Sequence, residues 1–367
     1  MRILFVMSGL GAGGAEKIVN LLAHHRAACG DEVHVAALNA QDTQSYFPYG
    51  SGIQLVALSG PGRLSDRFGK EALRIWGLRR YLVATRPDLV ISFLTKVNVM
   101  VRIASIGLNI PIVLSERNNF TSQGMNAIWR VARPLAARSA TRLVMQTQEA
   151  RNCLPARLRD KAVVIPNPVP PANTVSADQA VKGARIVAVG RMEMQKGFDL
   201  LLEAFKLASN ANPDLSLTIY GDGPQRRALQ EQARALDLTG RVSMPGITEK
   251  PGDWTASGDI FVLSSRFEGF PNVLLEAMMA GMASIAFACP WGPAEILCEP
   301  ETGVLVPDGD VRLLALAIRL LAGDEQLRRK LGLNAAHIAR TKYAMAAVLE
   351  KWDGLIASTT TAAERGR

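Results

Sequence analysis

The stretch DIFVLSSRFEGFPNVLLEAMMAGM, residues 259–282, reads as a strand, a loop and a helix. Its apolar run 259–265 lacks polar alternation, which is typical of a strand buried on both faces of a parallel sheet. Pro271 suits the first turn of a helix, because the N–H that it lacks has no partner there. The stretch therefore predicts a strand–loop–helix unit of an α/β fold, with its loop at the carboxyl end of the strand.

The same alternation runs through the whole chain of 367 residues. Buried strands separated by helices predict parallel sheets that are covered on both faces. The expected strands are 3–8, 32–38, 88–93, 111–115, 142–147, 162–166, 185–190, 215–221, 241–246, 259–265, 283–288 and 303–307. The expected helices are 15–28, 64–84, 96–106, 123–140, 148–158, 198–208, 224–237, 272–280, 310–322, 325–341 and 343–357.

A stretch with four prolines and no periodicity, PNPVPPANTVSADQAVKGA at 166–184, is typical of a linker and divides this pattern. We therefore predict two doubly wound, Rossmann-like α/β domains that face each other across a cleft, which is where ligands of such sheets bind. The predicted parts are a first domain at 1–168, a linker at 169–183, a second domain at 184–342 and a last helix at 343–357 that packs back on the first domain.

Composition narrows the class of protein. With 48% hydrophobic and 20% charged residues the chain builds ordinary globular cores, and no run approaches the roughly 20 apolar residues of a membrane-spanning helix. The start MRILFVMSGLGAGG could pass as a weak signal peptide, but a first buried strand followed by a glycine loop fits it better. Cys29, Cys153, Cys289 and Cys298 show no metal-ligand spacing, so we expect no metal site and a cytoplasmic protein.

Positive charge is concentrated in the first half of the chain. Residues 1–170 hold 21 Lys and Arg against 10 Asp and Glu, whereas the remainder holds 21 against 23. The segment 63–86 is basic and amphipathic, which fits either a solvated helix face or docking on an anionic inner membrane surface. No zinc-finger spacing or ribonucleoprotein motif is present, so we expect no nucleic-acid partner.

A glycine-rich loop, MSGLGAGGAEK at 7–17, follows the first expected strand. Gly9, Gly11 and Gly14 fit the G-x-G-x-x-G pattern of a dinucleotide-binding dehydrogenase. That class of enzyme also needs an acidic residue at the end of the second strand, where this chain has Asn39. The dehydrogenase interpretation is therefore weakened but stays open, beside that of a general anion-binding turn at a helix start.

Two cations follow the first strand of the second domain, in VGRMEMQKGFDLLLEAF at 189–205. Arg191 and Lys196 stand in the loop before a helix, where they can bind a diphosphate or simply be surface charges. Asp222, in the later turn YGDGP, is equally well explained as a turn residue or as a ligand contact.

The loop and helix of the opening stretch add two carboxylates. The amides of Asn272, Val273 and Leu274 begin the helix and can face an anion. Glu276, about one turn later, can accept hydrogen bonds from a vicinal diol such as a ribose, and Glu268 stands nearer the reacting end. Taken singly, either acid is explained by the helix dipole or by solvation, but both together with two cations indicate a binding site.

Several motifs in order, GLGAGGAEK, IPNPV, VGRMEMQKGFDLLLEAF, IYGDGP and SSRFEGFPNVLLEAMMAGM, make the chain resemble the retaining glycosyltransferases of family 4, which have the GT-B fold. The resemblance extends from residue 1 to about 357 and is nearest to the subgroup that builds bacterial surface polysaccharides and lipid-linked oligosaccharides. It implies transfer of a sugar from a nucleotide-sugar, a UDP- or GDP-sugar, to a hydroxyl of a glycan or lipid-linked glycan. It implies neither a metal nor a cofactor.

The resemblance also implies roles for individual residues. Arg191 and Lys196 hold the diphosphate, Glu276 the ribose, and Glu268 the transferred sugar. Glycines of the first domain close over the diphosphate, and Thr248 lies near the base. The further donor-binding residues are Gly13, Gly14, Asp222, Gly269, Phe270, Pro271, Asn272, Val273 and Leu274.

The chain departs from the family pattern at one position. Many members carry a His after the fifth strand of the first domain, and none of the four histidines here stands there. In LSERNNF, at 114–120, Arg117 takes that place as a catalytic candidate, and Glu116 and Asn118 are candidates for the acceptor side. Two alternatives stay open, namely a GT-B enzyme that isomerises or hydrolyses nucleotide-sugars and a nucleotide-sugar-binding protein without transfer activity.

Overall fold

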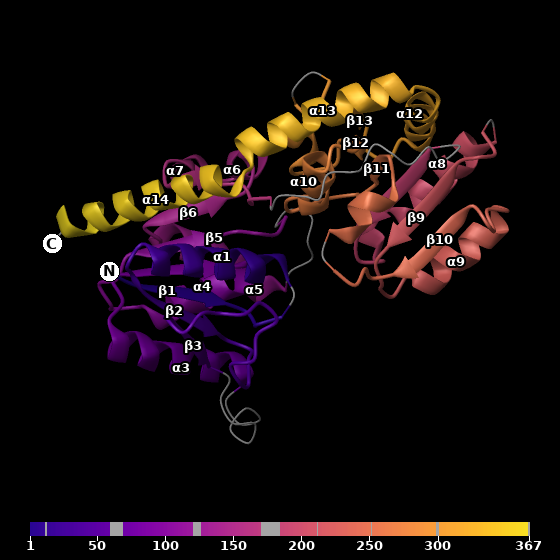
Figure 1. The fold of residues 1–367 in the computed structure, drawn as a ribbon. Helices are drawn as coiled ribbons and strands as arrows, with labels where there is room; N and C mark the ends of the chain where they lie inside the picture. Colours follow the sequence, from indigo (N-terminus) through magenta and orange to yellow (C-terminus); the bar gives the residue numbers. More distant parts are fainter. Residues whose placement is uncertain are drawn as a thin grey trace. The chain divides into compact units, whose positions relative to one another are not determined.

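The computed structural model describes residues 1–11, 13–58, 69–119, 126–169, 184–210, 212–250, 252–298 and 301–365. They form two compact units, which are described separately (Figure 1). Unit 1 comprises Met1–Pro166 together with Leu349–Arg367, and unit 2 comprises Asn167–Val348. Apart from Val169, the predicted linker lies outside the described residues.

Unit 1 is built on a parallel sheet of seven strands in the order β3-β2-β1-β4-β5-β6-β7. Phe5 at its centre is in register with Val35 on one side and Ile91 on the other, and all three side chains are fully buried. The strands are β1 (Arg2–Met7), β2 (Glu32–Ala37), β3 (Ile53–Ala57), β4 (Leu89–Phe93), β5 (Ile112–Ser115), β6 (Arg142–Met145) and β7 (Ala162–Val164).

The helices of unit 1 are α1 (Gly14–Ala28), α3 (Lys70–Thr85), α4 (Thr95–Ala104), α5 (Ala127–Ser139), α6 (Gln148–Asn152), α7 (Ala156–Arg159) and most of α14 (Met345–Arg365). Trp352 of α14 is fully buried, with its ring 5.9 Å from that of Phe93. Asp353 pairs with His25 and Arg26 of α1 at 2.8 and 2.7 Å. The last helix is thus joined to unit 1 by both apolar and charged contacts.

Unit 2 holds a second parallel sheet, of six strands in the order β10-β9-β8-β11-β12-β13. Its strands are β8 (Arg185–Val189), β9 (Ser216–Tyr220), β10 (Val242–Gly246), β11 (Ile260–Leu263), β12 (Ala283–Phe287) and β13 (Val304–Val306). Its helices are α8 (Phe198–Ser209), α9 (Arg226–Ala235), α10 (Asn272–Met279), α11 (Pro293–Ile296), α12 (Val311–Gly323) and α13 (Glu325–Lys342), with the 3₁₀ turns η1 (Met194–Lys196) and η2 (Asp253–Ser257).

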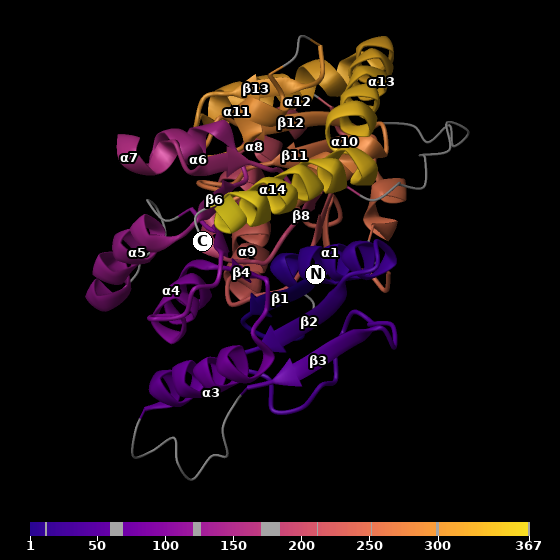
Figure 2. The same cartoon turned by 90° about the vertical axis from the view of Figure 1, so that its left-hand side faces the viewer.

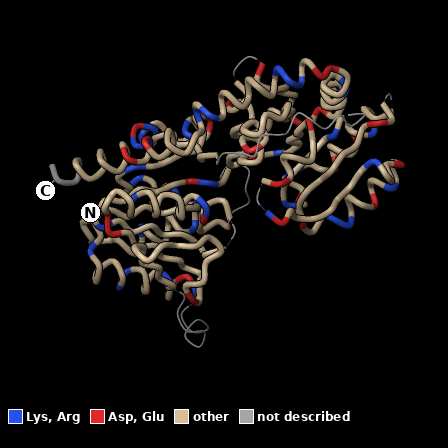
Figure 3. The backbone as a smooth tube through the Cα atoms, in the orientation of Figure 1, with Lys and Arg blue, Asp and Glu red and all other residues tan. Residues whose placement is uncertain are grey.

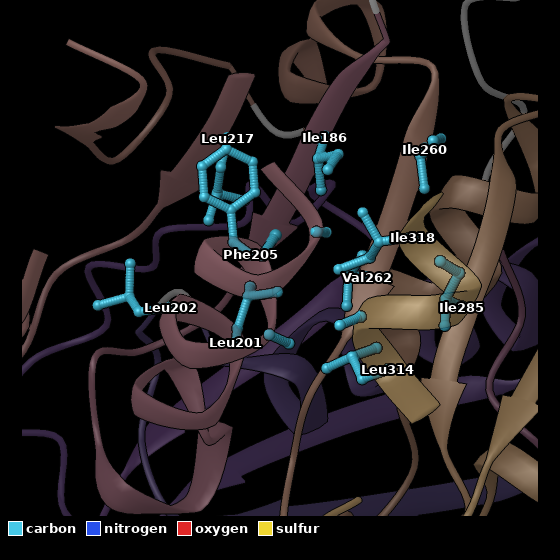
Figure 4. Close-up of a cluster of buried hydrophobic side chains, with 14 of the residues drawn as sticks. Ile186, Leu201, Leu202, Phe205, Leu217, Ile260, Val262, Ile285, Leu314 and Ile318 are labelled. Atoms are coloured by element: carbon cyan, nitrogen blue, oxygen red, sulfur yellow. The ribbon is translucent and has the colours of Figure 1, made fainter. Parts of the chain in front are cut away.

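The core of unit 2 shows why these segments fold as they do. Leu201 and Phe205 lie one turn apart on α8, and both are fully buried against the sheet (Figure 4). Ile186 and Val262, on neighbouring strands, and Ile318 of α12 complete this layer. The predicted pair of doubly wound α/β domains is confirmed.

Strand order places the loops that matter. In each sheet the order reverses between two adjacent strands, β1 and β4 in unit 1 and β8 and β11 in unit 2. Loops that leave the carboxyl ends of such strands diverge to opposite faces and open a crevice between them. The glycine loop follows β1, the Arg191–Lys196 loop follows β8, and the Glu268 loop follows β11.

Some predicted elements differ from the structure. Strand β3 was not predicted, the helix expected at 148–158 is two short helices separated by Pro155, and α11 was not predicted. The helix expected at 64–84 begins at Lys70, and residues 64–68 lie outside the described residues. Within the described part of the chain, no helix combines the length and the apolarity needed to cross a membrane.

Candidate functional site

The loops after β8 and β11 approach each other at backbone level. Ser264 Oγ donates a hydrogen bond to the Lys196 carbonyl oxygen at 2.9 Å. Gly197 has a φ of +61°, and a Cβ atom there would collide with the Ser264 carbonyl. Only glycine allows this approach and this backbone conformation together. The Lys196 end of one loop is therefore held against the start of the other.

Arg266 fastens the same two loops with its side chain. Its guanidinium donates to both carboxylate oxygens of Asp199, at 2.8 and 2.6 Å, and to the Met194 carbonyl at 2.8 Å. Its backbone N–H donates to the Gln195 carbonyl at 2.8 Å. The Arg266 hydrogen bonds hold the pKa of Asp199 below its usual value. A bidentate pair of this kind fixes direction as well as distance, so the loops act as one rigid piece.

Lys196 and Glu268 meet at the centre of this piece. Lys196 Nζ lies 2.7 Å from Glu268 Oε1, which also accepts a hydrogen bond from Ser265 Oγ at 2.6 Å. The Lys196 side chain is 17% exposed and that of Glu268 only 5%. The aliphatic part of Lys196 lies over Gly190, where a Cβ atom would press on it. Charge, hydroxyl and glycine together set the direction in which the ammonium points.

Arg191 and Asp222 lie on the more open edge of this site. The Arg191 side chain is 74% exposed and makes an ion pair with Glu193 at 3.1 Å, so its guanidinium can turn to a ligand. The Asp222 carboxylate accepts the N–H of Gly223 at 2.8 Å and lies 3.7 Å from Arg226 Nη1. These contacts show Asp222 shaping its own turn, at the carboxyl end of β9.

The start of α10 is arranged differently from the prediction in one respect. The Asn272 N–H donates to the Phe270 carbonyl and the Leu274 N–H to the Pro271 carbonyl, both at 3.0 Å, so two of the three amides expected to face an anion already have acceptors. Asn167 Nδ2 donates to Asn272 Oδ1 at 2.7 Å and orients that side chain. Val273 and Glu276 are half-buried on the same helix, and Gly269 and Pro271 flank the buried Phe270 ring.

Two further residues of unit 2, Thr248 and Cys289, have contacts that bear on the predicted site. Thr248, after β10, is half-buried and donates its hydroxyl to the Lys250 carbonyl at 3.0 Å. Burial raises the pKa of the Cys289 thiol far above its usual value, and the nearby carboxylates of Glu268 and Asp308 act in the same direction. Cys289 therefore stays a thiol and is no candidate nucleophile.

In unit 1, Glu116 is the centre of a buried polar network. Its carboxylate accepts hydrogen bonds from Thr95 Oγ1 at 2.6 Å and Asn98 Nδ2 at 3.1 Å. Asn98 in turn accepts from Ser92 Oγ at 2.7 Å. Burial raises the pKa of Glu116, although these hydrogen bonds and the charge of Arg133 oppose the shift. Glu116 thus sits inside the protein, at the carboxyl ends of β4 and β5.

Arg117 is held between aromatic rings rather than in the open. Its Cζ atom lies 5.0 Å from the Phe93 ring centroid and 5.8 Å from that of Trp352. Burial lowers the pKa of its guanidinium to about 9, so it remains a cation at neutral pH. The adjacent Asn118 is half-buried.

The predicted glycines of unit 1 lie at the start of α1. Gly13 caps the N-terminus of this helix, Gly14 is its first residue, and the Lys17 N–H donates to the Gly13 carbonyl at 3.0 Å.

The structure also contains site residues that sequence reasoning missed. Ser265, Arg266 and Asp199 were missed because a lone hydroxyl or charge in a loop carries no pattern. Asn167 stands within the motif IPNPV, whose polar residue between prolines was a usable signal. Among the described residues, no group of three or more His, Cys, Asp and Glu side chains is close enough to hold a metal ion.

Comparison with known families covers most of the chain in two matches. Residues 13–168 match the glycosyl transferase 4-like domain, and residues 175–338 match the glycosyl transferases group 1 domain.

Two bacterial relatives match nearly the whole chain, one of similar length and one much longer. The chain is 26% identical to the Campylobacter jejuni GalNAc-α-(1→4)-GalNAc-α-(1→3)-diNAcBac-PP-undecaprenol α-1,4-N-acetyl-D-galactosaminyltransferase, over 99% of this chain and 100% of that enzyme. The chain is also 29% identical to the exopolysaccharide phosphotransferase SCO2592 of Streptomyces coelicolor. This match covers 97% of the chain but only 40% of that larger protein.

Solved structures with the same fold cover nearly the whole chain. The sucrose-phosphate synthase of Thermosynechococcus elongatus has a TM-score of 0.83 at 19% identity, over 99% of this chain and 100% of that one. HepE of Anabaena, in complex with UDP, has a TM-score of 0.76 at 19% identity, over 98% and 100%. The chain therefore belongs to the glycosyltransferases, with a 4-like domain followed by a group 1 domain on the GT-B fold, as the sequence motifs predicted.

Proposed function

We propose that this glycosyltransferase moves a hexose from a UDP- or GDP-sugar to a hydroxyl of a lipid-linked glycan, with retention at the anomeric carbon and without a metal ion. The observation that carries the proposal is the fixed Lys196–Glu268 pair beside the exposed Arg191, at the switch point of the unit 2 sheet. The HepE structure, which shares the fold, is a complex with UDP. A nucleotide diphosphate bound at this edge would meet both cations.

The two cations have complementary tasks in this proposal. As the bond between the sugar and the diphosphate breaks, negative charge accumulates on the leaving phosphate. Lys196 is held in place before the donor arrives, so its charge needs no reorganisation at that moment. Arg191 is mobile enough to close over the diphosphate and bind it bidentately. Together, the held Lys196 and the closing Arg191 would supply the positive charge that a metal ion supplies in other enzymes.

Glu268 has two roles, one for each oxygen. Both hydrogen bonds that described side chains give to this carboxylate go to Oε1. We assign Oε2 to a hydroxyl of the transferred sugar, because a carboxylate fixed on one side is a directional acceptor on the other.

The remaining donor contacts follow the family pattern. We assign Glu276 to the ribose and Thr248 to the neighbourhood of the base. We assign the backbone amides of Gly269 and Val273 to hydrogen bonds with the sugar and the phosphates. On unit 1, we assign Gly13 and Gly14 to the diphosphate. Asp222 shapes the turn beside the site.

The acceptor assignment rests on the relatives and on unit 1. The Campylobacter relative is named for a glycan carried on undecaprenyl diphosphate, and we propose an acceptor of this chemical class at the inner membrane face. Asn118 is assigned a polar contact with the acceptor. Glu116 is buried in a hydrogen-bonding network and Arg117 is half-buried against aromatic rings, so we assign them the positioning of this loop rather than contact with the leaving phosphate.

Two assays with the whole purified protein test the proposal. Thermal shift with a panel of UDP- and GDP-sugars should identify a donor that raises the melting temperature. That donor, with an undecaprenyl-diphosphate-linked oligosaccharide, should give a product whose anomeric configuration by NMR matches the donor, with equal rates in EDTA. A strict Mg²⁺ requirement or an inverted product would overturn the corresponding part. Donor consumption that ignores the acceptor would favour the isomerase or hydrolase alternative.

A further inference from the structure

Helix α5 of unit 1 leaves a row of large apolar side chains on its outer face. Ile128, Val131 and Leu135 are 76, 64 and 57% exposed. The spacing of three and four residues places them on one side of the helix, and we call them the α5 row. Exposure of such a row to water is unfavourable in free energy, and contiguous exposed apolar side chains are typical of a surface that binds a membrane or another protein.

The opposite face of α5 is the one that binds its own unit. Ala136 is buried and Trp129 is half-buried, with Lys96 Nζ of α4 lying 5.9 Å from the Trp129 ring centroid. At the other end Arg102 Nε of α4 donates to Ser139 Oγ at 2.7 Å. Both ends of α5 are thus fixed to α4, so the α5 row is a face left uncovered by a well-attached helix.

Charge on the α5 side of unit 1 has one sign. Between Thr95 and Ser139 the chain carries six Lys and Arg, and its single carboxylate is the buried Glu116. Arg130 and Arg138 are exposed on α5. Arg138 follows Leu135 by three residues and shares its side of the helix, and Arg130 directly precedes Val131 in the chain. Figure 2 shows α3, α4 and α5 side by side on one face of unit 1, and Figure 3 shows Lys and Arg distributed over unit 1. Exposed apolar side chains flanked by arginines are the combination that binds an anionic bilayer surface.

Helix α3, which carries most of the basic segment predicted to dock, is a weaker candidate. Arg79 uses its guanidinium on the carbonyls of Ala104 and Ile106, at 3.0 and 2.7 Å. Arg80 lies over the Trp76 ring at 4.7 Å. Residues 63–68 of that segment lie outside the described residues. The described cations of α3 are thus partly engaged within unit 1, whereas Arg130 and Arg138 are exposed on the helix that carries the open apolar row.

We propose that α5 is the membrane-docking helix of this protein, with Ile128, Val131 and Leu135 entering the interface of an anionic phospholipid bilayer and Arg130 and Arg138 contacting lipid phosphates. The proposal deepens the proposed function, since a lipid-linked acceptor is presented at such a surface. It does not depend on the identity of the donor or on the chemistry of transfer.

The test is sedimentation of the whole protein with vesicles of phosphatidylglycerol and phosphatidylethanolamine, compared with phosphatidylcholine alone. We expect binding to the anionic vesicles only, weakened by salt. The variant Ile128→Ser/Val131→Ser/Leu135→Ser should bind at least tenfold more weakly, and Arg130→Gln/Arg138→Gln should lose about fivefold per charge. The matched control Arg74→Gln/Arg80→Gln, two arginines on α3, should lose much less. Melting temperatures should stay near the wild-type value, because all of these side chains are at the surface.

Three outcomes would overturn the proposal. In the first, wild-type protein stays in the supernatant with anionic vesicles at low salt. In the second, the α5 variants bind these vesicles as tightly as wild type. In the third, the α3 variant loses as much vesicle affinity as the α5 variants. A wild-type dimer that the triple serine variant converts to a monomer would instead assign the row to a second copy of this chain. Transfer to a short water-soluble acceptor separates the two proposals, because it should survive the α5 substitutions and fail if the proposed function is wrong.

Discussion

Lys196 Nζ and Glu268 Oε1 lie 2.7 Å apart although the two residues are 72 positions apart in the chain. Adjacent strands bring them together, since β8 and β11 are neighbours at the point where the sheet order reverses. Under the proposed function, a lysine already held by a carboxylate is in position for a phosphate before any donor binds. The expected effects of substitution follow from this arrangement.

Loss of either cation should affect turnover more than donor binding. Lys196→Ala and Arg191→Ala should each lower kcat about a hundredfold or more, because their charge matters most as the diphosphate leaves. Steady-state kinetics with a soluble acceptor, together with calorimetric donor affinities, measure both quantities. An unchanged kcat in Arg191→Ala, whose side chain is largely exposed, would remove that residue from the site.

Arg266 should act through Lys196. Arg266→Ala should lower kcat about tenfold, since the β8 loop loses its bidentate attachment through Asp199. Compared with Arg266→Ala, Arg266→Lys should regain more of the unfolding free energy than of kcat, because an ammonium group cannot form the paired hydrogen bonds to Asp199. In the Lys196→Ala background the same substitution should cost little, and a double-mutant cycle measures this coupling. Strictly additive effects would contradict the assignment.

Glu276 should contribute to donor affinity. Glu276→Ala should weaken donor binding by about 1–3 kcal/mol, the cost of losing a charged hydrogen bond to ribose. Isothermal titration with the nucleoside diphosphate alone isolates this contact from the sugar. The matched control is Glu203→Ala on α8, an acid outside the proposed site, which should bind normally. Equal affinity in the Glu276 variant would disprove the ribose assignment.

Glu116 should make stability depend on pH. Its pKa is raised in the folded state, so the folded protein holds the proton more tightly than the unfolded chain. The stability that this proton provides is present below the unfolded pKa and is lost as pH rises through the folded value. Wild type should therefore lose stability between about pH 4.5 and about pH 7.5, whereas Glu116→Gln has no carboxyl group to ionise. The unfolding free energy of the variant minus that of wild type should increase over this range. Urea unfolding at both values measures it, and a difference independent of pH would count against the prediction.

Gly197 should tolerate no side chain. Gly197→Ala combines a left-handed φ of +61° with a collision at the Ser264 carbonyl. Gly309→Ala is the matched control, since Gly309 has a φ of +70° and open space around it. The control should lose about 1–2 kcal/mol of unfolding free energy from backbone strain alone, and Gly197→Ala clearly more. Equal losses in denaturant unfolding would mean that the close approach is not needed.

Sequence patterns predicted most strands because buried parallel strands read as uninterrupted apolar runs. Strand β3 escaped because IQLVA is short, lies at the sheet edge and has the exposed Gln54 within it. The site predictions relied on loops that follow strands, and Lys196 and Glu268 do lie together. Arg117 was predicted as a catalytic candidate in the place of the family histidine, and only three-dimensional packing shows its contacts with Phe93 and Trp352.

The α5 row illustrates a different limit of sequence reasoning. Apolar residues at 128, 131 and 135 have the spacing of a core-facing stripe, and periodicity does not tell which stripe is covered. Only the exposed fractions show that this one faces outward. The segment at 63–86 was predicted as a docking candidate because it is basic and amphipathic, but the contacts of Arg79 and Arg80 lie within unit 1.

The contacts between the β8 and β11 loops, formed by Arg266, Asp199, Gly197 and Ser264, also limit where two such enzymes can be recombined. A chimera with a crossover between positions 199 and 264 would combine one parent's β8 loop with another's β11 loop, and each half would lack its matching partner. Exchange of Asn167–Val348 as a block keeps every one of these contacts. If the proposed donor contacts of unit 2 are correct, exchange of this block should carry most of the donor preference with it, and a crossover inside it should not.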